Sequence, residues 1–288
     1  MSTKKMSDKL PESKLCNLDI DRNVARIHLN RSDVFNALNI QLIKELIDII
    51  QWTAERSVST TSSLRDSEDS EYLRVVVLTG EGKHFCAGAD INMMREAGSL
   101  SAEDNRIDSE RLDQLFFSLW SHPCFTIGCI QGVALGGGAG LVSCLDYVIA
   151  EPKTRIALSE AKLGILPAVI GPYVYRKIGS SNFRRLSMMA SKINSDEAMN
   201  IGLINSVVDS TDKFSKSSSK IISEVLSTGP MAVTEAKKLT LVFDRWEGSD
   251  KELREWTLDK TSQMRGSEEG QEGLSSFLEG RKPNWSTE

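Results

Sequence analysis

The chain has 288 residues, of which 40% are hydrophobic and 26% charged, and its formal net charge is −5. This composition is typical of a globular protein that is long enough for one large domain with an appendage. An acidic balance without a basic stripe argues against a nucleic-acid-binding protein, so no nucleic-acid partner is expected. No apolar run reaches the ~18 residues of a membrane span, so no membrane partner is expected either.

The few chemically reactive side chains are scattered along the sequence. Five Cys without C-x-x-C spacing predict free, buried thiols in a reducing compartment. Three His without clustering predict no metal site, and no separate cofactor is expected. Residues 1–15 are polar, are expected to be disordered and resemble neither a signal nor a transit peptide. We therefore expect a soluble intracellular protein of the cytoplasm or the mitochondrial matrix.

The first third of the chain alternates strand and helix patterns. Residues 23–30 alternate as a strand does, and residues 36–55 repeat apolar side chains at helical spacing. The stretch 56–72 is rich in Ser and acids, which predicts an exposed insertion. Residues 73–80 form a β-branched run that predicts a strand buried on both faces.

The remaining elements predict an α/β core followed by helices. A helix is expected at 106–121, a strand at 124–135, and a Gly-rich turn, short helix and strand over 136–152. A short strand and loop follow at 154–167. Further helices are expected at 184–190, 195–203 with Ser195 as N-cap, 213–227, 230–243 and 247–264. The pattern places the core at 16–210 and a helical region at 211–288.

Two turns combine very small residues with the end of a predicted strand: "HFCAGAD" at 84–90 and "ALGGGAG" at 134–140. The glycine spacing fits neither a dinucleotide-binding turn nor a P-loop. Two interpretations stay open. The backbone N–H groups of the two turns converge on one oxygen as an oxyanion hole, or glycine is needed there for close helix–strand packing.

The same segments carry a family resemblance. "HFCAGADI", "GVALGGGAGLVSCLDYVIA" and "ALSEAKLGILP", in this order, resemble the enoyl-CoA hydratase/isomerase (crotonase) superfamily. The resemblance implies an α/β fold, a crotonase-like spiral of ββα units with a helical C-terminal trimerisation region. It also implies an acyl-CoA thioester as substrate, with coenzyme A as part of that substrate, and assembly as a homotrimer or homohexamer.

The resemblance further implies the site residues. The two oxyanion donors fall on the backbone N–H groups of Ala87 and Gly137. The wall that binds substrate comprises Val34, Ala37, Ala87, Gly88, Ala89, Asp90 and Gly137. Asp90 is expected to orient its loop, Cys86 lacks the partners of a nucleophile, and Arg281 and Lys282 are weaker candidates for a CoA phosphate.

One catalytic carboxylate matches the family and one is missing. Glu160 stands where two-glutamate hydratases have their second acid, but Gly140 stands where they have the first. Glu160 could work alone as acid and base, or Glu110 or Asp113 could supply the missing group. Thioester hydrolases of the family carry an acid at the position of Ala168, which argues against hydrolysis.

The segment 158–174 is similar to methylglutaconyl-CoA hydratases of leucine breakdown. The sequence therefore favours an enoyl-CoA hydratase that adds water across the C2–C3 double bond of a branched or carboxylated acyl group. An enoyl-CoA isomerase that uses Glu160 alone is the alternative, and a homologue that binds CoA esters without turnover is the third possibility.

Overall fold

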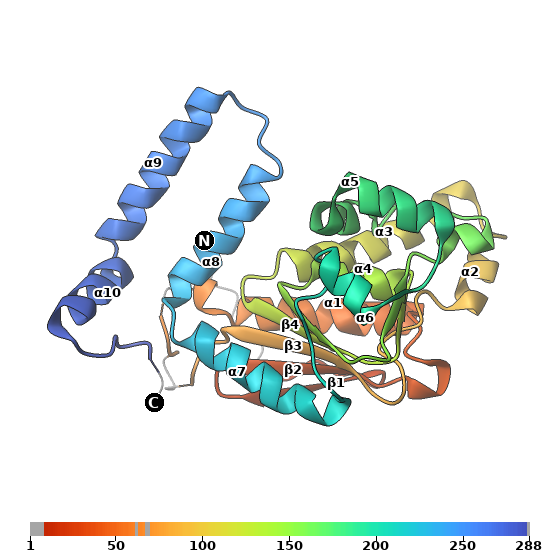
Figure 1. Ribbon diagram of the computed structural model, residues 1–288, viewed down its shortest axis with the longest axis horizontal. Helices are drawn as coiled ribbons and strands as arrows, with labels where there is room; N and C mark the ends of the chain where they lie inside the picture. Colours follow the sequence, from red (N-terminus) through yellow and green to blue (C-terminus); the bar gives the residue numbers. More distant parts are fainter. Residues whose placement is uncertain (1–8, 61–62, 67–69, 287–288) are drawn as a thin grey trace.

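The computed structural model describes residues 9–60, 63–66 and 70–286, and Figure 1 shows their arrangement. The strands are β1 (Cys16–Asp21), β2 (Val24–Leu29), β3 (Val75–Gly80), β4 (Phe125–Ile130), β5 (Val133–Leu135), β6 (Tyr147–Ala150), β7 (Arg155–Ala157), β8 (Ile193–Asn194) and β9 (Ser206–Val207). The helices are α1 (Ile40–Glu55), α2 (Ile91–Ala97), α3 (Ala102–Trp120), α4 (Gly137–Cys144), α5 (Gly171–Met189), α6 (Ser195–Asn200), α7 (Phe214–Leu226), α8 (Pro230–Phe243), α9 (Asp250–Gly266) and α10 (Glu268–Glu279).

The larger sheet has the strand order β1-β2-β3-β4-β6-β9. β1 and β2 are antiparallel, and the other neighbours are parallel. Parallel strands are buried on both faces by helices, which explains the β-branched run of β3. One face packs on α1, α3, α4 and α5, and the other face packs on Ile222 of α7.

The smaller sheet, of order β5-β7-β8, brings the two small-residue turns together. Cys86, just after β3, pairs with Ala134 of β5 as a parallel bridge. The Cys86 N–H donates to the Val133 carbonyl (3.1 Å), and the Leu135 N–H donates to the Cys86 carbonyl (3.0 Å). The exit of β3 therefore runs beside the strand that leads into α4.

The C-terminal helices project from this body. In Figure 1, α8 leaves the sheet region and α9 and α10 stand away from it. α9 has no buried residue, and α10 buries only Ser276. The chain then returns, and Trp285 becomes buried next to Arg74, which donates to the Trp285 carbonyl (3.2 Å).

Several expected elements are confirmed and their bounds are refined. The expected helix 36–55 begins later, at Ile40, because Phe35 and Asn36 have left-handed backbone (φ 58° and 55°) and Asn39 caps the helix. The expected strand 124–135 is two strands, because Gly132 turns the chain with φ 60°. The N-cap of α6 is Asn194, so the prediction of Ser195 as N-cap is wrong.

Other elements were not expected from the pattern. The sequence pattern did not predict β1, α2 and α10, which the structure contains. The helix expected at 184–190 begins already at Gly171. Its early start is hidden by Pro172 near the N-terminus and by a kink at Gly179, where φ is 74°.

The two segments expected to be mobile or exposed are partly anchored. Residues 1–8, 61–62 and 67–69 lie outside the described residues. The N–H groups of Lys14 and Leu15 donate to Glu45 of α1 (2.9 and 2.8 Å), so the end of the stretch 1–15 is ordered. Ser57 and Val58 are buried, so the insertion 56–72 is not exposed at its start.

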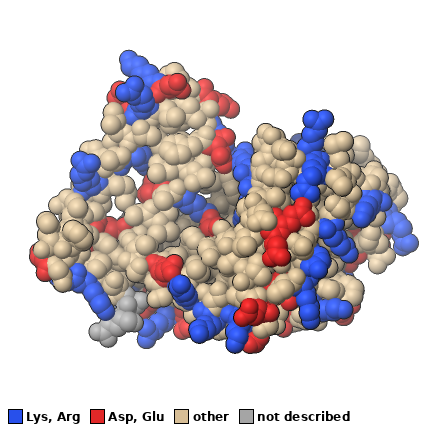
Figure 2. Space-filling model, in the orientation of Figure 1, with Lys and Arg blue, Asp and Glu red and all other residues tan. Residues whose placement is uncertain are grey.

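The surface carries both signs of charge. On the face seen in Figure 2, Lys and Arg are interspersed with Asp and Glu. Within the described part of the chain, no helix is long and apolar enough to cross a membrane. All five cysteines are free and buried, as predicted.

Candidate active site

The two small-residue turns meet so closely that side chains would collide. A Cβ atom on Gly88, which has φ 98°, would stand 2.6 Å from the Leu135 carbonyl oxygen and 3.6 Å from the Gly137 nitrogen. A Cβ atom on Gly137 would stand 3.7 Å from the Ala89 nitrogen. The backbone nitrogens of Ala89 and Gly137 therefore border one small space.

The structure contradicts the expectation that the Ala87 N–H is available as an oxyanion donor. The Ala87 N–H donates to the Phe35 carbonyl (2.9 Å), so it is not free for a ligand, contrary to the expectation from sequence. Within the described residues, no hydrogen bond is found from the N–H of Ala89 or of Gly137. Gly137 is the first residue of α4, where backbone N–H groups have no partner within the helix. Among the described residues, Ala89 and not Ala87 therefore has the unbonded N–H beside Gly137.

The segment 31–38 runs along residues 87–90 and forms a wall with them. The Leu38 N–H donates to the Gly88 carbonyl (2.8 Å), and the Asp90 N–H donates to the Leu38 carbonyl (2.9 Å). Val34 is 37% exposed and Phe35 is 50% exposed, so apolar side chains remain available at the rim. The sequence-predicted wall residues are therefore neighbours in space.

The side chain of Asp90 connects the two segments of this wall. One carboxylate oxygen accepts from the Asn92 N–H (2.9 Å) and caps α2, while the other pairs with Arg31 (2.7 Å). Arg31 also donates to the Ala37 carbonyl (2.8 Å). The hydrogen bond from Arg31 lowers the pKa of Asp90. Asp90 therefore orients the loop, as predicted.

Glu160 points its carboxylate at the turn that precedes α4. A Cβ atom on Gly136 would lie 3.1 Å from Glu160 Oε1. Its Oε2 atom is buried and has no hydrogen-bond partner within the described residues. Burial raises the pKa of Glu160 above its ordinary value. A partly buried carboxyl group whose buried oxygen has no partner is a candidate for a catalytic acid or base.

The position of the missing glutamate is occupied by apolar side chains. A Cβ atom on Gly140 would stand 2.5 Å from Ile170 Cγ2 and 2.9 Å from Phe116 Cε1. Glycine at this position thus makes room for Ile170 at the start of α5. No second carboxylate fits there without displacing Ile170 or Phe116.

The acids considered as replacements have other partners. Glu110 forms an ion pair with Arg106 (3.1 Å) on the exposed side of α3, so the structure does not support it as a second acid. Asp113 accepts a hydrogen bond from the Tyr173 hydroxyl (3.2 Å). Glu160 is therefore the acid that the structure places beside the α4 N-terminus.

Two further residues considered in the sequence analysis, Cys86 and Arg281, lie in surroundings that do not suit a role in the site. Burial raises the pKa of the Cys86 thiol to about 12, so it is unsuited to act as a thiolate nucleophile. Arg281 is held by Glu272 (2.6 and 2.7 Å) and Glu279 (2.7 Å), which leaves it poorly placed for a CoA phosphate.

Comparison with known proteins shows which family this chain resembles in sequence and fold. A family model described as "Enoyl-CoA hydratase/isomerase" matches residues 19–288. The crotonyl-CoA hydratase of Syntrophomonas wolfei is 29% identical over 273 residues, or 93% of this chain and 96% of that protein. The short-chain-enoyl-CoA hydratase of Clostridium acetobutylicum is 31% identical over 223 residues, or 77% and 78%. The crystal structure of an enoyl-CoA hydratase from Shewanella pealeana matches with a TM-score of 0.85 and 31% identity, over 95% and 97%.

The chain therefore belongs to the enoyl-CoA hydratase/isomerase family. It is an enzyme of the enoyl-CoA hydratase type, for which the family implies an acyl-CoA substrate. The expected α/β crotonase fold, with two sheets and C-terminal helices, is confirmed. The comparisons give no support to the narrower resemblance to methylglutaconyl-CoA hydratases.

Proposed function

We propose that this protein hydrates the C2–C3 double bond of an acyl-CoA thioester, with the N–H groups of Ala89 and Gly137 binding the thioester oxygen. These hydrogen bonds strengthen as the oxygen gains negative charge in the enolate, so they stabilise the transition state more than the substrate. The α4 N-terminus adds a favourable local field, since its partial charge is positive.

Glu160 is the single acid and base in this proposal. Its carboxylate takes a proton from water as the water oxygen bonds to C3, and the electron pair of the double bond moves toward the thioester. The protonated Glu160 then returns the proton to C2, which completes the addition. The observation that carries this role is the buried Glu160 Oε2, which has no hydrogen-bond partner among the described residues.

An isomerase is the second candidate, because the environment of Gly140 favours it. Ile170 and Phe116 fill the space beside Gly140, so the second carboxylate of a two-glutamate hydratase has no room there. In an isomerase, Glu160 takes a proton from C2 of a 3-enoyl thioester and returns it to C4. No water enters this reaction.

The deciding experiment compares two substrates with purified protein. Crotonyl-CoA reports hydration through loss of its enoyl absorbance, and a 3-enoyl-CoA reports isomerisation through gain of that absorbance. Faster turnover of crotonyl-CoA supports the hydratase, and turnover of the 3-enoyl-CoA alone supports the isomerase. Failure to turn over either thioester would overturn the proposal.

The role of Glu160 is tested by Glu160→Gln, which keeps the shape and removes the proton transfer. We expect kcat to fall about 10²–10⁴-fold while CoA-ester binding is retained, since a positioned acid–base contributes roughly that factor. Asp113→Asn serves as a control for a nearby carboxylate. Full activity of Glu160→Gln would exclude the single-carboxylate mechanism.

The acyl group is a narrower part of the proposal. The resemblance of segment 158–174 favours a branched or carboxylated acyl chain, and methylglutaconyl-CoA is the test substrate. The relatives described above are a crotonyl-CoA and a short-chain-enoyl-CoA hydratase. A higher kcat/KM for crotonyl-CoA than for methylglutaconyl-CoA would exclude the branched preference.

A further inference from the structure

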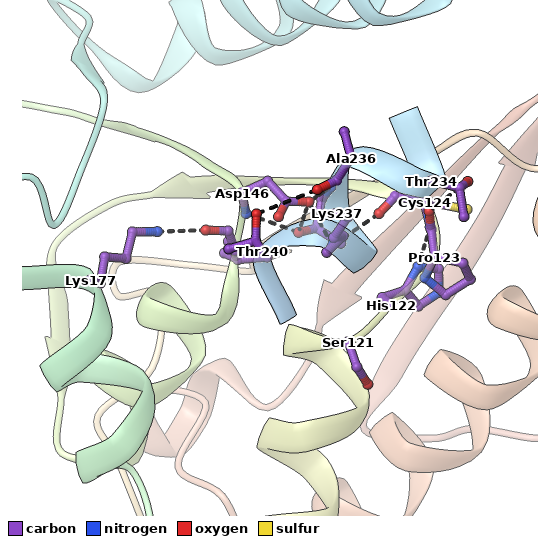
Figure 3. Close-up of polar contacts among 12 residues, drawn as sticks. Ser121, His122, Pro123, Cys124, Asp146, Lys177, Thr234, Ala236, Lys237 and Thr240 are labelled. Atoms are coloured by element: carbon purple, nitrogen blue, oxygen red, sulfur yellow. Dashed lines mark hydrogen bonds and ion pairs between the residues drawn. The ribbon is translucent and has the colours of Figure 1, made fainter. Parts of the chain in front are cut away.

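The C-terminal end of α4 is held by a lysine that the chemistry above does not use. Lys177 Nζ donates to the carbonyl of Leu145 (2.5 Å) and to the carbonyl of Val142 (3.3 Å). Figure 3 shows the Lys177 side chain extended from α5 toward this end of α4. The last carbonyls of a helix have no partner within it, and a cation is favourable there.

α4 has little else that is polar with which to hold its position. Its residues from Gly138 to Cys144 are all buried, and its first turn consists of glycines and alanine. Gly138 and Gly140 pack closely against Cys86 and Ile170, but they offer no side chain for a polar contact. The start of α4 is held by the Gly136 N–H, which donates to the Ala157 carbonyl (2.9 Å), and the bonds of Lys177 hold the opposite end of the same helix.

Lys177 also belongs to the same segment as the proposed acid. Glu160 lies in the short 3₁₀ helix Glu160–Leu163, which leads directly to α5, and this helix and α5 are in contact. Ile170 and Tyr173 on this segment pack beside Gly140 and Phe116. The bonds from Lys177 to the end of α4 thus join α5, which contacts the 3₁₀ helix of Glu160, to the helix that begins at Gly137.

We propose that Lys177 is a positioning residue, which holds α4 so that the Gly137 N–H and the Glu160 carboxylate keep their productive separation. This inference rests on the proposed function. Misplacement of a reacting group by about 1 Å costs roughly 10²-fold in rate, so a small shift of α4 is sufficient for a large effect. Lys177 itself touches no reacting atom.

The surroundings of Lys177 contain three other ionisable groups. Asp146, just before β6, pairs with Lys237 of α8 (2.7 Å), and Cys144 ends α4. Figure 3 shows Asp146 between the two lysines. Asp146 raises the pKa of Lys177 and Lys237 lowers it, but burial is the largest effect and lowers it to about 8.

The decisive variants are Lys177→Met, which removes the donor at similar size, and Lys177→Arg, which keeps a cationic donor. With Lys177→Met we expect kcat for crotonyl-CoA to fall about 10- to 100-fold, because misplacement acts on the rate. We expect KM to stay within threefold. Lys177→Arg restores most of kcat, and Lys220→Met, at an exposed lysine of α7, leaves it unchanged.

The pH dependence of kcat distinguishes a positioning role of Lys177 from a role in folding alone. Wild-type kcat is expected to decline near pH 8 as Lys177 loses its charge, and the decline moves to higher pH in Lys177→Arg. A lower melting temperature of Lys177→Met with unchanged kcat per folded molecule would overturn the proposal.

Amide hydrogen exchange of residues 137–144 gives a readout that needs no turnover. Faster exchange in Lys177→Met than in wild type supports the proposal, and equal exchange contradicts it. If wild type turns over no enoyl-CoA, the proposed function fails, while the exchange data still decide whether Lys177 holds α4.

Discussion

At the scale of residues, the environment of the missing glutamate depends on how two residues share one space. Gly140 lacks a side chain, and Ile170, from the start of another helix, fills the space beside it. The two residues are distant in sequence, yet Ile170 fits at its position only because residue 140 is a glycine. The loss of a family carboxylate at Gly140 is therefore matched by apolar side chains that fill its space.

Gly140→Glu is expected to destabilise the protein instead of restoring a second acid. A side chain at this position meets Ile170 at 2.5 Å and Phe116 at 2.9 Å. Overpacking of a core costs about 1–3 kcal/mol, and a buried charge adds to this. Urea unfolding measures the loss, and adding Ile170→Ala to Gly140→Glu is expected to relieve the steric part of it but not the cost of the buried charge. A stable, more active single variant would contradict this account.

Glu160 is expected to link activity and stability to pH in opposite directions. Its pKa is raised in the folded protein, so kcat/KM decreases as pH falls through that raised value, because the carboxylate must be ionised to accept a proton. The unfolded chain ionises this group at lower pH than the folded chain does. Stability contributed by the neutral form is therefore lost as pH rises through the raised pKa.

It follows that Glu160→Gln should be more stable than wild type at pH 7 and no more stable at pH 3. Urea unfolding at the two pH values checks this, and Glu110→Gln, on the exposed side of α3, is the matched control. A Glu160→Gln variant that is less stable than wild type at pH 7 would mean that the carboxylate is satisfied by a partner.

At the scale of elements, short connections between segments set the shape of the wall formed by residues 31–38 and 87–90. Residues 31–38 have no long secondary structure, but they are attached to the loop 87–90 by backbone hydrogen bonds and by the Arg31–Asp90 pair. Left-handed backbone at Phe35 and Asn36 lets this segment fold back before α1 begins. The wall is therefore made by two loops that support each other.

Asp90→Ala is expected to loosen this wall. The change removes the N-cap of α2 and the partner of Arg31, which together cost about 1–3 kcal/mol. We expect KM for the CoA ester to rise more than kcat falls. Because the pKa of Asp90 is lowered, its contribution is present above its ordinary pKa and is lost as pH falls through the folded value.

Urea unfolding of wild type and Asp90→Ala at pH 7 and at pH 3 measures this contribution. The difference between the two proteins should shrink at the lower pH. A difference that is the same at both pH values would show that the charge of Asp90 is not what stabilises the loop.

At the scale of the whole molecule, the C-terminal helices leave large apolar side chains exposed. α9 buries none of its residues, and Phe277 and Leu278 of α10 are 85% and 83% exposed. Exposed apolar side chains gathered on projecting helices indicate a protein–protein contact. The trimer or hexamer expected from the family resemblance is the assembly that would cover them.

We therefore expect the purified protein to sediment as a homotrimer or homohexamer. The double variant Phe277→Asp with Leu278→Asp should lower the sedimentation coefficient toward that of a monomer, because the charges oppose burial of that face. Thr261→Asp, at an exposed polar position of α9, is the control. A wild-type monomer at micromolar concentration would contradict the expectation.

Much of this molecule was predictable from sequence, and the exceptions have identifiable causes. The buried run of β3 and the amphipathic α1 follow from local patterns, whereas Glu160 was singled out through the family resemblance. The choice between Ala87 and Ala89 does not, because it depends on the left-handed conformation of Phe35, which directs a carbonyl to Ala87. The filling of Gly140 depends on Ile170, a contact that no local pattern encodes.

The five buried thiols allow the opening of individual parts of this protein to be timed without any mutation. Burial raises the pKa of each thiol, so alkylating reagents react only after the surrounding structure opens. Cys16 reports on the edge of the larger sheet, Cys129 on its centre and Cys144 on the last turn of α4. Mass spectrometry of trapped peptides would rank these regions by the frequency of their fluctuations.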